Sequence, residues 1–146
     1  MRMPSAALVG GVALLLTLVG HLSAQVPGGR PEAALKNPVA AAPESIAAGE
    51  KSYQRYCRGC HGKDATGGPA RESDMPVPAN LIDDQYRFGG NEGEVFSVIK
   101  NGVPPEFDMA AWAERLDDTE IWNVVNYLRD LAAKKKGAGG SVPPSK

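Results

Sequence analysis

The chemistry in this sequence centres on its two cysteines, Cys57 and Cys60, which are separated by two residues and followed at once by His61. A Cys-x-x-Cys-His stretch is typical of c-type haem attachment. Each thiol would add across one vinyl group of the haem, and the imidazole of His61 would reach the iron. Because one helical turn can present all three groups to one edge of a porphyrin, the stretch predicts a single, covalently bound haem c.

Three other interpretations start from the same two cysteines: a thioredoxin-like redox pair, half of a zinc site and a structural disulfide. A zinc site needs about four ligands, and the second histidine, His21, lies in the N-terminal segment. A thioredoxin-like pair is expected in a βαβ context, whereas the residues around Cys57 have a helical pattern. Two thiols outside the cytoplasm would normally oxidise to a disulfide. Export, the histidine directly after Cys60 and the helix–loop layout all fit haem, so we favour haem attachment over all three interpretations.

A second axial ligand is expected to be a methionine, because a thioether opposite histidine suits a low-spin electron carrier. Beyond the N-terminal segment the chain has two methionines, Met75 and Met109, which follow His61 by fourteen and forty-eight residues. A ligand on the opposite face requires the chain to cross the haem and return. A helix and a loop precede Met109, so we favour Met109; filling a gap in the core is the alternative for either residue.

Three helices are predicted to position these groups. The first covers residues 45–57 and leads into the cysteine motif, and the second covers residues 91–100. The third begins at Asp117, which forms a capping box with Glu120. Its apolar side chains follow the i, i+3, i+4, i+7 spacing, and they are Ile121, Val124, Val125, Leu128 and Leu131. The pattern predicts an all-α fold whose long loops surround the cofactor.

Composition divides the chain around that fold. We expect a Pro/Ala-rich extended linker at 25–44, a folded domain at 45–133, and a basic, Gly/Pro-rich disordered tail at 134–146. The domain has nine Lys/Arg and fifteen Asp/Glu residues, a net charge of −6. This balance argues against nucleic acid as a partner and predicts a protein partner whose surface includes positive charge.

The N-terminus predicts export. Arg2 precedes a continuous apolar run at 6–20, and small residues follow it. This is typical of a signal peptide at 1–24, cleaved after Ala24, which would place the domain in the periplasm. An uncleaved anchor facing the periplasm is the alternative, and only then would the chain contact a membrane. A helix over 6–22 spans roughly 25 Å, which is short of the ~30 Å hydrocarbon core.

An ordered set of short stretches resembles the bacterial class I c-type cytochromes, which are small, single-haem periplasmic electron carriers. The stretches cover nearly all of 45–133, and they are Gly49 to Tyr56, Cys57 to His61, Gly67 to Pro69, Asn80-Leu81, Gly93 to Gly102, Met109 to Trp112 and Glu120 to Leu131. The resemblance implies the cytochrome c fold. It also implies thioethers at Cys57 and Cys60, with His61 as proximal and Met109 as distal ligand.

The resemblance implies roles for residues beyond the motif. The carbonyl of Pro69 would accept a hydrogen bond from the His61 ring, and Gly49 and Tyr127 would mark the crossing of the first and last helices. Trp112 would pack beside the haem or donate its N–H to a propionate. Arg71 and Arg87 are candidate propionate partners, with simple exposure as the alternative. One departure is Ala110, since many relatives have proline directly after the methionine.

These expectations combine into a function. With histidine and methionine both bound, the iron has no open position, so the chain would carry electrons and would not itself be an enzyme. Its partners would be a dehydrogenase, a cytochrome complex or an oxidase. The exposed haem edge is expected between the cysteine motif and residues 103–111. The alternative is an enzyme or gas sensor with five-coordinate haem.

Overall fold

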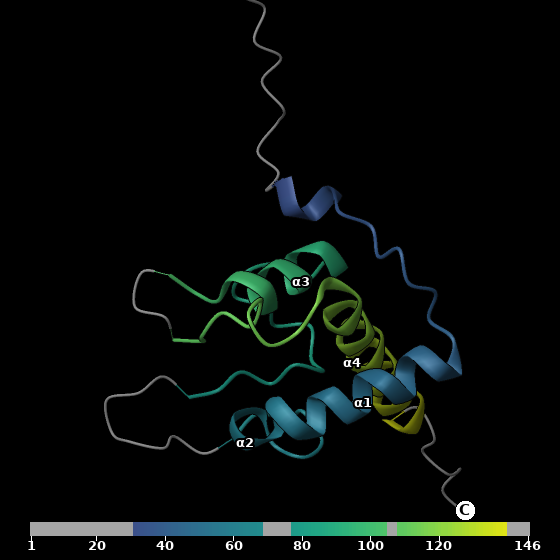
Figure 1. The fold of residues 1–146 in the computed structure, drawn as a ribbon. Coiled ribbons are helices and arrows are strands. Elements are labelled where there is room, and N and C mark those ends of the chain that lie inside the picture. The colour runs from purple at the N-terminus through teal and green to yellow at the C-terminus, as the bar shows by residue number, and fades with distance from the viewer. Residues whose placement is uncertain (1–30, 69–76, 105–107, 140–146) are drawn as a thin grey trace, which may run out of the picture.

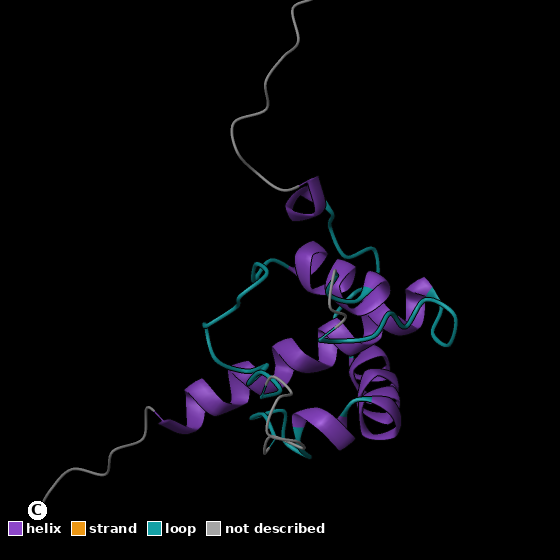
Figure 2. Ribbon diagram, turned by 90° about the vertical axis from the view of Figure 1, so that its left-hand side faces the viewer, coloured by secondary structure: helices purple, strands orange, loops and turns teal. Residues whose placement is uncertain are grey.

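The computed structural model describes residues 31–68, 77–104 and 108–139, and the regular elements within them are helices. In chain order they are η1 (Pro31–Ala34), α1 (Pro43–Tyr56), α2 (Arg58–His61), α3 (Glu92–Asn101) and α4 (Asp118–Gly139). Helices α1 and α4 form the main packing pair, and α3 packs against α4 (Figure 1). Figure 2 shows helices joined by loops, with no strand in the described part of the chain. The predicted all-α fold is confirmed.

Helices α1 and α4 meet at Gly49, which is buried. A Cβ at this position would overlap the carbonyl oxygen of Asn123 and lie 2.9 Å from Cβ of Tyr127. The two backbones therefore approach as closely as they do only because residue 49 has no side chain. One turn further along α1, the ring of Tyr53 packs against that of Tyr127, with 5.4 Å between centroids.

The core is formed by the apolar stripe of α4 together with side chains from α1 and α3. Ile121, Val124 and Val125 are at most 1 % exposed. Phe96 of α3 stacks on Trp122 of α4, with 4.1 Å between centroids and 14° between ring planes. The predicted helical stripe is thus the face that α4 buries.

Two capping boxes fix where the long helices begin. The N–H of Glu120 donates to the Asp117 carboxylate at 2.8 Å, and the N–H of Asp117 donates to Glu120 at 3.0 Å. This confirms the predicted start of α4. A second box, which sequence analysis did not identify, pairs Asn91 with Glu94 at the start of α3. Both boxes satisfy backbone N–H groups that have no partner inside the helix.

We expected an extended linker at 25–44, but residues 37–40 of this segment contact the helical domain. The contact is made by Asn126 of α4, which is 3 % exposed. The Asn126 amide accepts a hydrogen bond from Asn37 at 2.8 Å and donates to the Val39 carbonyl at 3.1 Å and to Ser45 Oγ at 2.8 Å. A buried amide needs such partners, and residues 37–45 supply them.

Replacing Asn126 with alanine is expected to release this segment. Because the partners of the amide would lose their hydrogen bonds inside a packed interface, the free energy of unfolding should fall by about 1–3 kcal/mol. Amide hydrogen exchange should rise over residues 37–45 and stay unchanged in α3. Unchanged exchange at 37–45 would show that the amide does not tether the segment.

The C-terminal boundary also differs from the prediction. We expected disorder from residue 134, but α4 continues to Gly139, beyond which the chain lies outside the described residues. Lys134 pairs with Asp130 one turn earlier at 2.6 Å, and Lys136 pairs with Asp84 at 2.9 Å. The hydrogen bond to Asp130 raises the pKa of Lys134. One lysine thus pairs within α4 and the other with a distant loop residue, and a composition argument captures neither contact.

None of the described helices is long and apolar enough to cross a bilayer. The predicted signal peptide at 1–24 lies outside the described residues.

Candidate haem-binding site

The cysteine motif lies where α1 passes into α2. The N–H of Cys57 still donates to the Tyr53 carbonyl at 2.8 Å, and the N–H of His61 donates to the Cys57 carbonyl at 3.0 Å. At the end of the motif the Tyr53 hydroxyl donates to the Gly62 carbonyl at 2.7 Å. Local helical bonds and a buried tyrosine thus hold both thiols and the imidazole on one turn.

The two cysteines are free thiols in different surroundings: Cys57 is half-buried and Cys60 is exposed. Burial, and next the neighbouring Cys60, raise the pKa of Cys57 to about 11. Burial also raises the pKa of the adjacent Tyr53. The Cys57 thiol is therefore protonated at neutral pH, in the S–H form whose addition to a vinyl group gives a thioether. The raised values mark an apolar surrounding on the inner side of the motif.

His61 is oriented by a backbone carbonyl. Its Nδ1 lies 3.0 Å from the carbonyl oxygen of Ala79. Because a carbonyl only accepts, Nδ1 carries the proton, and the lone pair of Nε2 is left free to bind a metal. We expected Pro69 to accept this bond, but Pro69 lies outside the described residues and the structure gives the role to Ala79.

The backbone around Ala79 is fixed by the loop that follows α2. Gly67 has φ +93°, and a Cβ there would come within 2.9 Å of the Pro78 carbonyl oxygen. The N–H of Leu81 donates to the carbonyl of Ala65 at 2.8 Å. The stretches of chain on either side of Ala79 are thus held against residues 65–67. The one sequence feature that pointed to this part of the loop was the Asn80-Leu81 pair, which directly follows Ala79.

A cavity of about 350 Å³ lies beside the motif. This volume is within the range of small-molecule and cofactor sites in proteins. The predicted site residues within the described chain all line it: Cys57, Cys60, His61, Met109 and Trp112. Its remaining walls are largely apolar and aromatic, among them Tyr56, Leu81, Val95, Ile99, Val103, Val124 and Leu128. The fold therefore brings the predicted attachment, proximal and distal groups to one cavity.

The half-buried Met109 is positioned by the end of α3. The N–H of Val103 donates to the Met109 carbonyl at 2.9 Å, and the N–H of Trp112 donates to the Ile99 carbonyl at 3.1 Å. Gly102 ends α3 with φ +72°, and a Cβ there would lie 2.6 Å from the Met109 carbonyl oxygen. The methionine segment therefore packs on a glycine that no other residue replaces without strain.

Two other predicted residues border the cavity. The Trp112 ring packs against the ring of Tyr56, with 5.7 Å between centroids. The guanidinium carbon of Arg115 lies 5.8 Å from the centroid of the Trp112 ring. Arg87 lines the cavity but is 75 % exposed and lies 3.7 Å from Asp108, the residue before Met109. The other candidate propionate partner, Arg71, lies outside the described residues.

These residues fit a haem c. The cavity wall carries two thiols on one helical turn, an imidazole with a free Nε2, and a thioether on a separate segment. Apolar and aromatic side chains would cover the porphyrin plane. A histidine and a methionine thus line the same cavity, and this pair of side chains is typical of the ligands in electron-transfer cytochromes c.

Fold and site together define a c-type cytochrome. The chain belongs to the family described as cytochrome c oxidase, cbb3-type, subunit III, whose pattern matches residues 44–128. The match covers the domain from the start of α1 to the middle of α4, including both cysteines, His61 and Met109.

Two curated relatives show how the likeness is distributed. The chain is 32 % identical over 87 residues to the cbb3-type cytochrome c oxidase subunit CcoP of Azospirillum brasilense, covering 60 % of this chain and 28 % of CcoP. It is 32 % identical over 94 residues to cytochrome c6 of Cladophora glomerata, covering 64 % of this chain and 96 % of cytochrome c6. The chain thus spans less than a third of CcoP but nearly all of cytochrome c6.

Solved structures agree on the fold. A chain of the Kuenenia stuttgartiensis reducing HAO-like protein complex superposes with a TM-score of 0.58 at 23 % identity, over 68 % of this chain and 48 % of that one. Cytochrome cL of Methylophaga aminisulfidivorans gives a TM-score of 0.50 at 24 % identity, over 71 % and 70 %. At these identities the likeness establishes the fold alone.

Proposed function

We propose that this chain is a periplasmic electron carrier with one haem c, attached through Cys57 and Cys60 and ligated by His61 and Met109. When bound, the haem supplies reversible one-electron chemistry at its iron. The observation that carries the proposal is that His61 and Met109 line one largely apolar cavity together with both thiols. The family supports haem c and electron transfer; the ligand pair and the number of haems are inferred.

Each ligand would be held from behind by the backbone. The Ala79 carbonyl fixes the His61 ring and increases its basicity. The Met109 carbonyl is held by Val103, so the thioether is presented from a segment fastened to α3. Apolar walls would exclude water from the iron and favour a stable coordination sphere. Pro69 remains proposed as a neighbour of the proximal side, and Trp112 as a residue packed at the haem edge.

The partner would be a redox protein: a dehydrogenase, a cytochrome complex or a terminal oxidase. The relatives named as cbb3-type oxidase subunits support an acceptor of the oxidase class. The match over nearly all of cytochrome c6 supports a carrier of single-domain size. Export through residues 1–24 would place this exchange in the periplasm.

Carbon monoxide tests the closed coordination sphere in the haem-loaded protein. We expect a low-spin ferric spectrum with a methionine-to-iron charge-transfer band, and slow, incomplete carbon monoxide binding to the ferrous form. High-spin ferric iron and immediate carbon monoxide binding would instead support the five-coordinate enzyme or gas sensor. Haem lost on acid extraction would contradict attachment at Cys57 and Cys60.

Replacing Gly102 with alanine is expected to displace Met109 without affecting haem attachment. A Cβ at φ +72° is strained by roughly 1–2 kcal/mol and would press on the Met109 carbonyl, 2.6 Å away. The charge-transfer band should weaken and carbon monoxide should bind faster, while the haem content stays constant. A band of full intensity in this variant would show that Gly102 does not position the ligand.

A further inference from the structure

One wall of the cavity is formed by the loop before α3. We call residues 81–90 the wall loop, and those that line the cavity are Leu81, Gln85, Tyr86, Arg87, Phe88 and Gly89. The wall loop has turns and bends in place of a helix, so side chains supply part of its hydrogen bonding. The N–H of Ile82 donates to the Asn80 side chain at 3.0 Å, and the N–H of Gln85 donates to the Asp83 carboxylate at 2.9 Å. The position of this wall therefore depends on side-chain contacts.

Tyr86 holds the two ends of the wall loop together. Its hydroxyl donates to the Leu81 carbonyl at 2.8 Å, and its ring rests on Gly90, where a Cβ would lie 2.9 Å from Cδ2 of Tyr86. A phenol has one O–H to donate, and the bond to Leu81 uses it. Tyr86 therefore contributes its ring to the cavity wall, and its hydroxyl proton stays within the loop.

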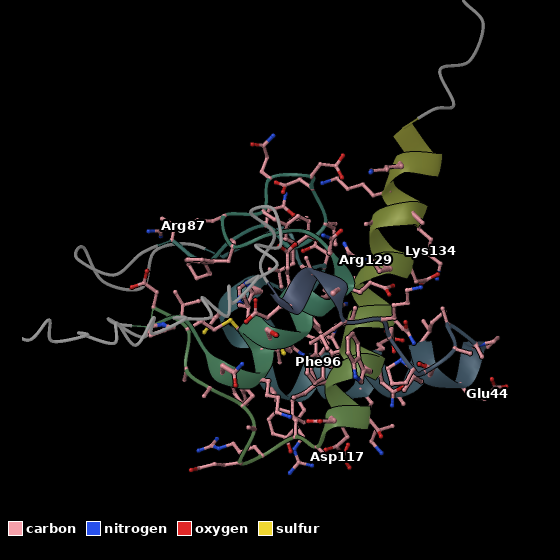
Figure 3. All side chains as sticks on the ribbon, turned by 90° about the horizontal axis from the view of Figure 1, so that it is seen from above. Glu44, Arg87, Phe96, Asp117, Arg129 and Lys134 are labelled. Carbon is pink, nitrogen blue, oxygen red and sulfur yellow. The ribbon has the colours of Figure 1, made fainter. Side chains whose placement is uncertain are left out.

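Arg129 of α4 binds the wall loop at two points. Its Nη1 donates to the Tyr86 hydroxyl at 3.2 Å, and its Nη2 donates to the Gly90 carbonyl. The guanidinium carbon also lies 5.6 Å from the centroid of the Tyr86 ring. Figure 3 shows Arg129 on the side of α4 that faces this loop. Because Gly90 directly precedes Asn91, which caps α3, one half-buried side chain joins α4, the cavity wall and the start of α3.

Two acceptors in different parts of the loop suit an arginine better than a lysine. The guanidinium is planar and presents several N–H donors in a fixed fork, whereas the ammonium of lysine is a point charge on a flexible stem. A lysine at position 129 would keep the charge but would lose the fixed geometry that reaches Tyr86 and Gly90 together. The contact at this position thus depends on shape as well as on charge.

We infer that Arg129 is a positioning residue for the haem: it holds the Tyr86 ring and the wall loop in place, and the wall keeps water from the porphyrin. Arg129 is not among the residues that line the cavity, so it would act only through Tyr86 and Gly90. Water favours ferric haem, which carries one more positive charge than ferrous haem, and burial is one means by which a protein sets a haem potential. The inference rests on the proposed electron-carrier function and names a residue that would raise its potential.

Lys136 offers a matched control on the same helix and the same loop. It follows Arg129 by seven residues, about two helical turns, and pairs with Asp84 of the wall loop at 2.9 Å. Both side chains of this pair are mostly exposed, at 62 % and 79 %, and an exposed ion pair contributes little to stability. Lys136→Gln therefore removes a charge near the loop, whereas Arg129→Lys keeps the charge and removes the fork.

Amide hydrogen exchange and the midpoint potential, both measured on the haem-loaded protein, test the inference. Arg129→Lys and Tyr86→Phe should each raise exchange over residues 82–90 by about fivefold, the effect of losing one hydrogen bond of average strength. Each should also lower the midpoint potential. Lys136→Gln should change exchange by less than about twofold and leave the potential unchanged. The double variant of Arg129→Lys and Tyr86→Phe should show less than the product of the two single effects on exchange, because both substitutions disturb the same bond.

The outcomes separate this inference from the function on which it rests. A potential that falls in Lys136→Gln but not in Arg129→Lys would show that charge acts on the haem and position does not. Faster exchange with an unchanged potential would leave Arg129 a purely structural residue, and a fall in Tyr86→Phe alone would assign the effect to Tyr86. Each of these results overturns the inference and leaves the carrier function standing. A wild-type haem without a reversible one-electron couple would overturn the carrier function and this inference with it.

Discussion

Replacing Gly49 with alanine is expected to lower the free energy of unfolding of the haem-loaded protein by about 3 kcal/mol. The new Cβ would overlap the Asn123 carbonyl oxygen and press on Tyr127. Neither neighbour is the flexible end of a side chain, so α1 and α4 would have to separate. Because alanine favours a helix over glycine by about 1 kcal/mol, the measured loss understates the steric cost. Denaturant unfolding followed by haem absorbance measures it.

The chain supplies a matched control in Gly137, which lies in α4; a methyl group at this position would meet no atom of the described residues within 4 Å. Gly137→Ala should leave stability unchanged or raise it by up to about 1 kcal/mol through helix propensity. The two substitutions are chemically identical and are expected to have opposite signs. Similar effects in both variants would contradict a backbone-to-backbone crossing at Gly49.

Replacing Met109 with alanine should abolish the methionine-to-iron charge-transfer band and lower the midpoint potential. A thioether favours ferrous iron, and axial ligands tune haem potentials over a range of ~0.8 V. We expect a fall of at least about 0.1 V, on the order of what loss of one such ligand produces. Haem should stay covalently attached, because both cysteines and the His61–Ala79 hydrogen bond remain.

Met75→Ala is the control for this substitution, since Met75 is the other methionine considered as a ligand. It should retain the band and the potential. Loss of the band in Met75→Ala, with its retention in Met109→Ala, would assign the distal ligand to Met75. Retention in both variants would show that neither thioether binds the iron.

Sequence patterns predicted the main helices because the residues that specify them are local. Asp117 and Glu120 begin α4 as expected, and the apolar stripe after them is the face that α4 buries. The cavity residues could also be predicted. The Cys-x-x-Cys-His spacing is compatible with few kinds of site, and the helix before Met109 gives the chain enough length to return to the opposite face of the haem. These residues line one cavity, and their roles in binding the haem stay predictions.

The remaining features depend on contacts between distant residues. The carbonyl that orients His61 belongs to Ala79, eighteen residues away. The position of this carbonyl depends on how the loop packs at Gly67, and the side-chain types in the loop do not predict that packing. Residues 37–45 are ordered because Asn126, some eighty residues later, is buried and needs hydrogen-bond partners. The composition of this segment therefore predicts a linker, although its hydrogen bonds to Asn126 fasten it to α4.

Charge is a further case in which position outweighs composition. The domain total predicts attraction to a basic surface, but it does not say which charged side chains lie beside the cavity. Figure 3 shows Arg87 at one side of the molecule, with Glu44 at the other. Arg87 lines the cavity, but its partner Asp108 offsets its charge. The fold, and not the total charge, therefore decides which charged side chains lie beside the cavity.

Iron K-edge X-ray absorption of the haem-loaded protein tests the central claim most directly, because it reports the atoms bound to the metal. The thioether sulfurs of Cys57 and Cys60 attach to the porphyrin periphery and do not bind iron, so a sulfur in the coordination shell must come from an axial ligand. We predict five nitrogens and one sulfur in the wild type, with the sulfur absent in Met109→Ala. A wild-type shell without sulfur, or a sulfur that persists in Met109→Ala, would contradict the account.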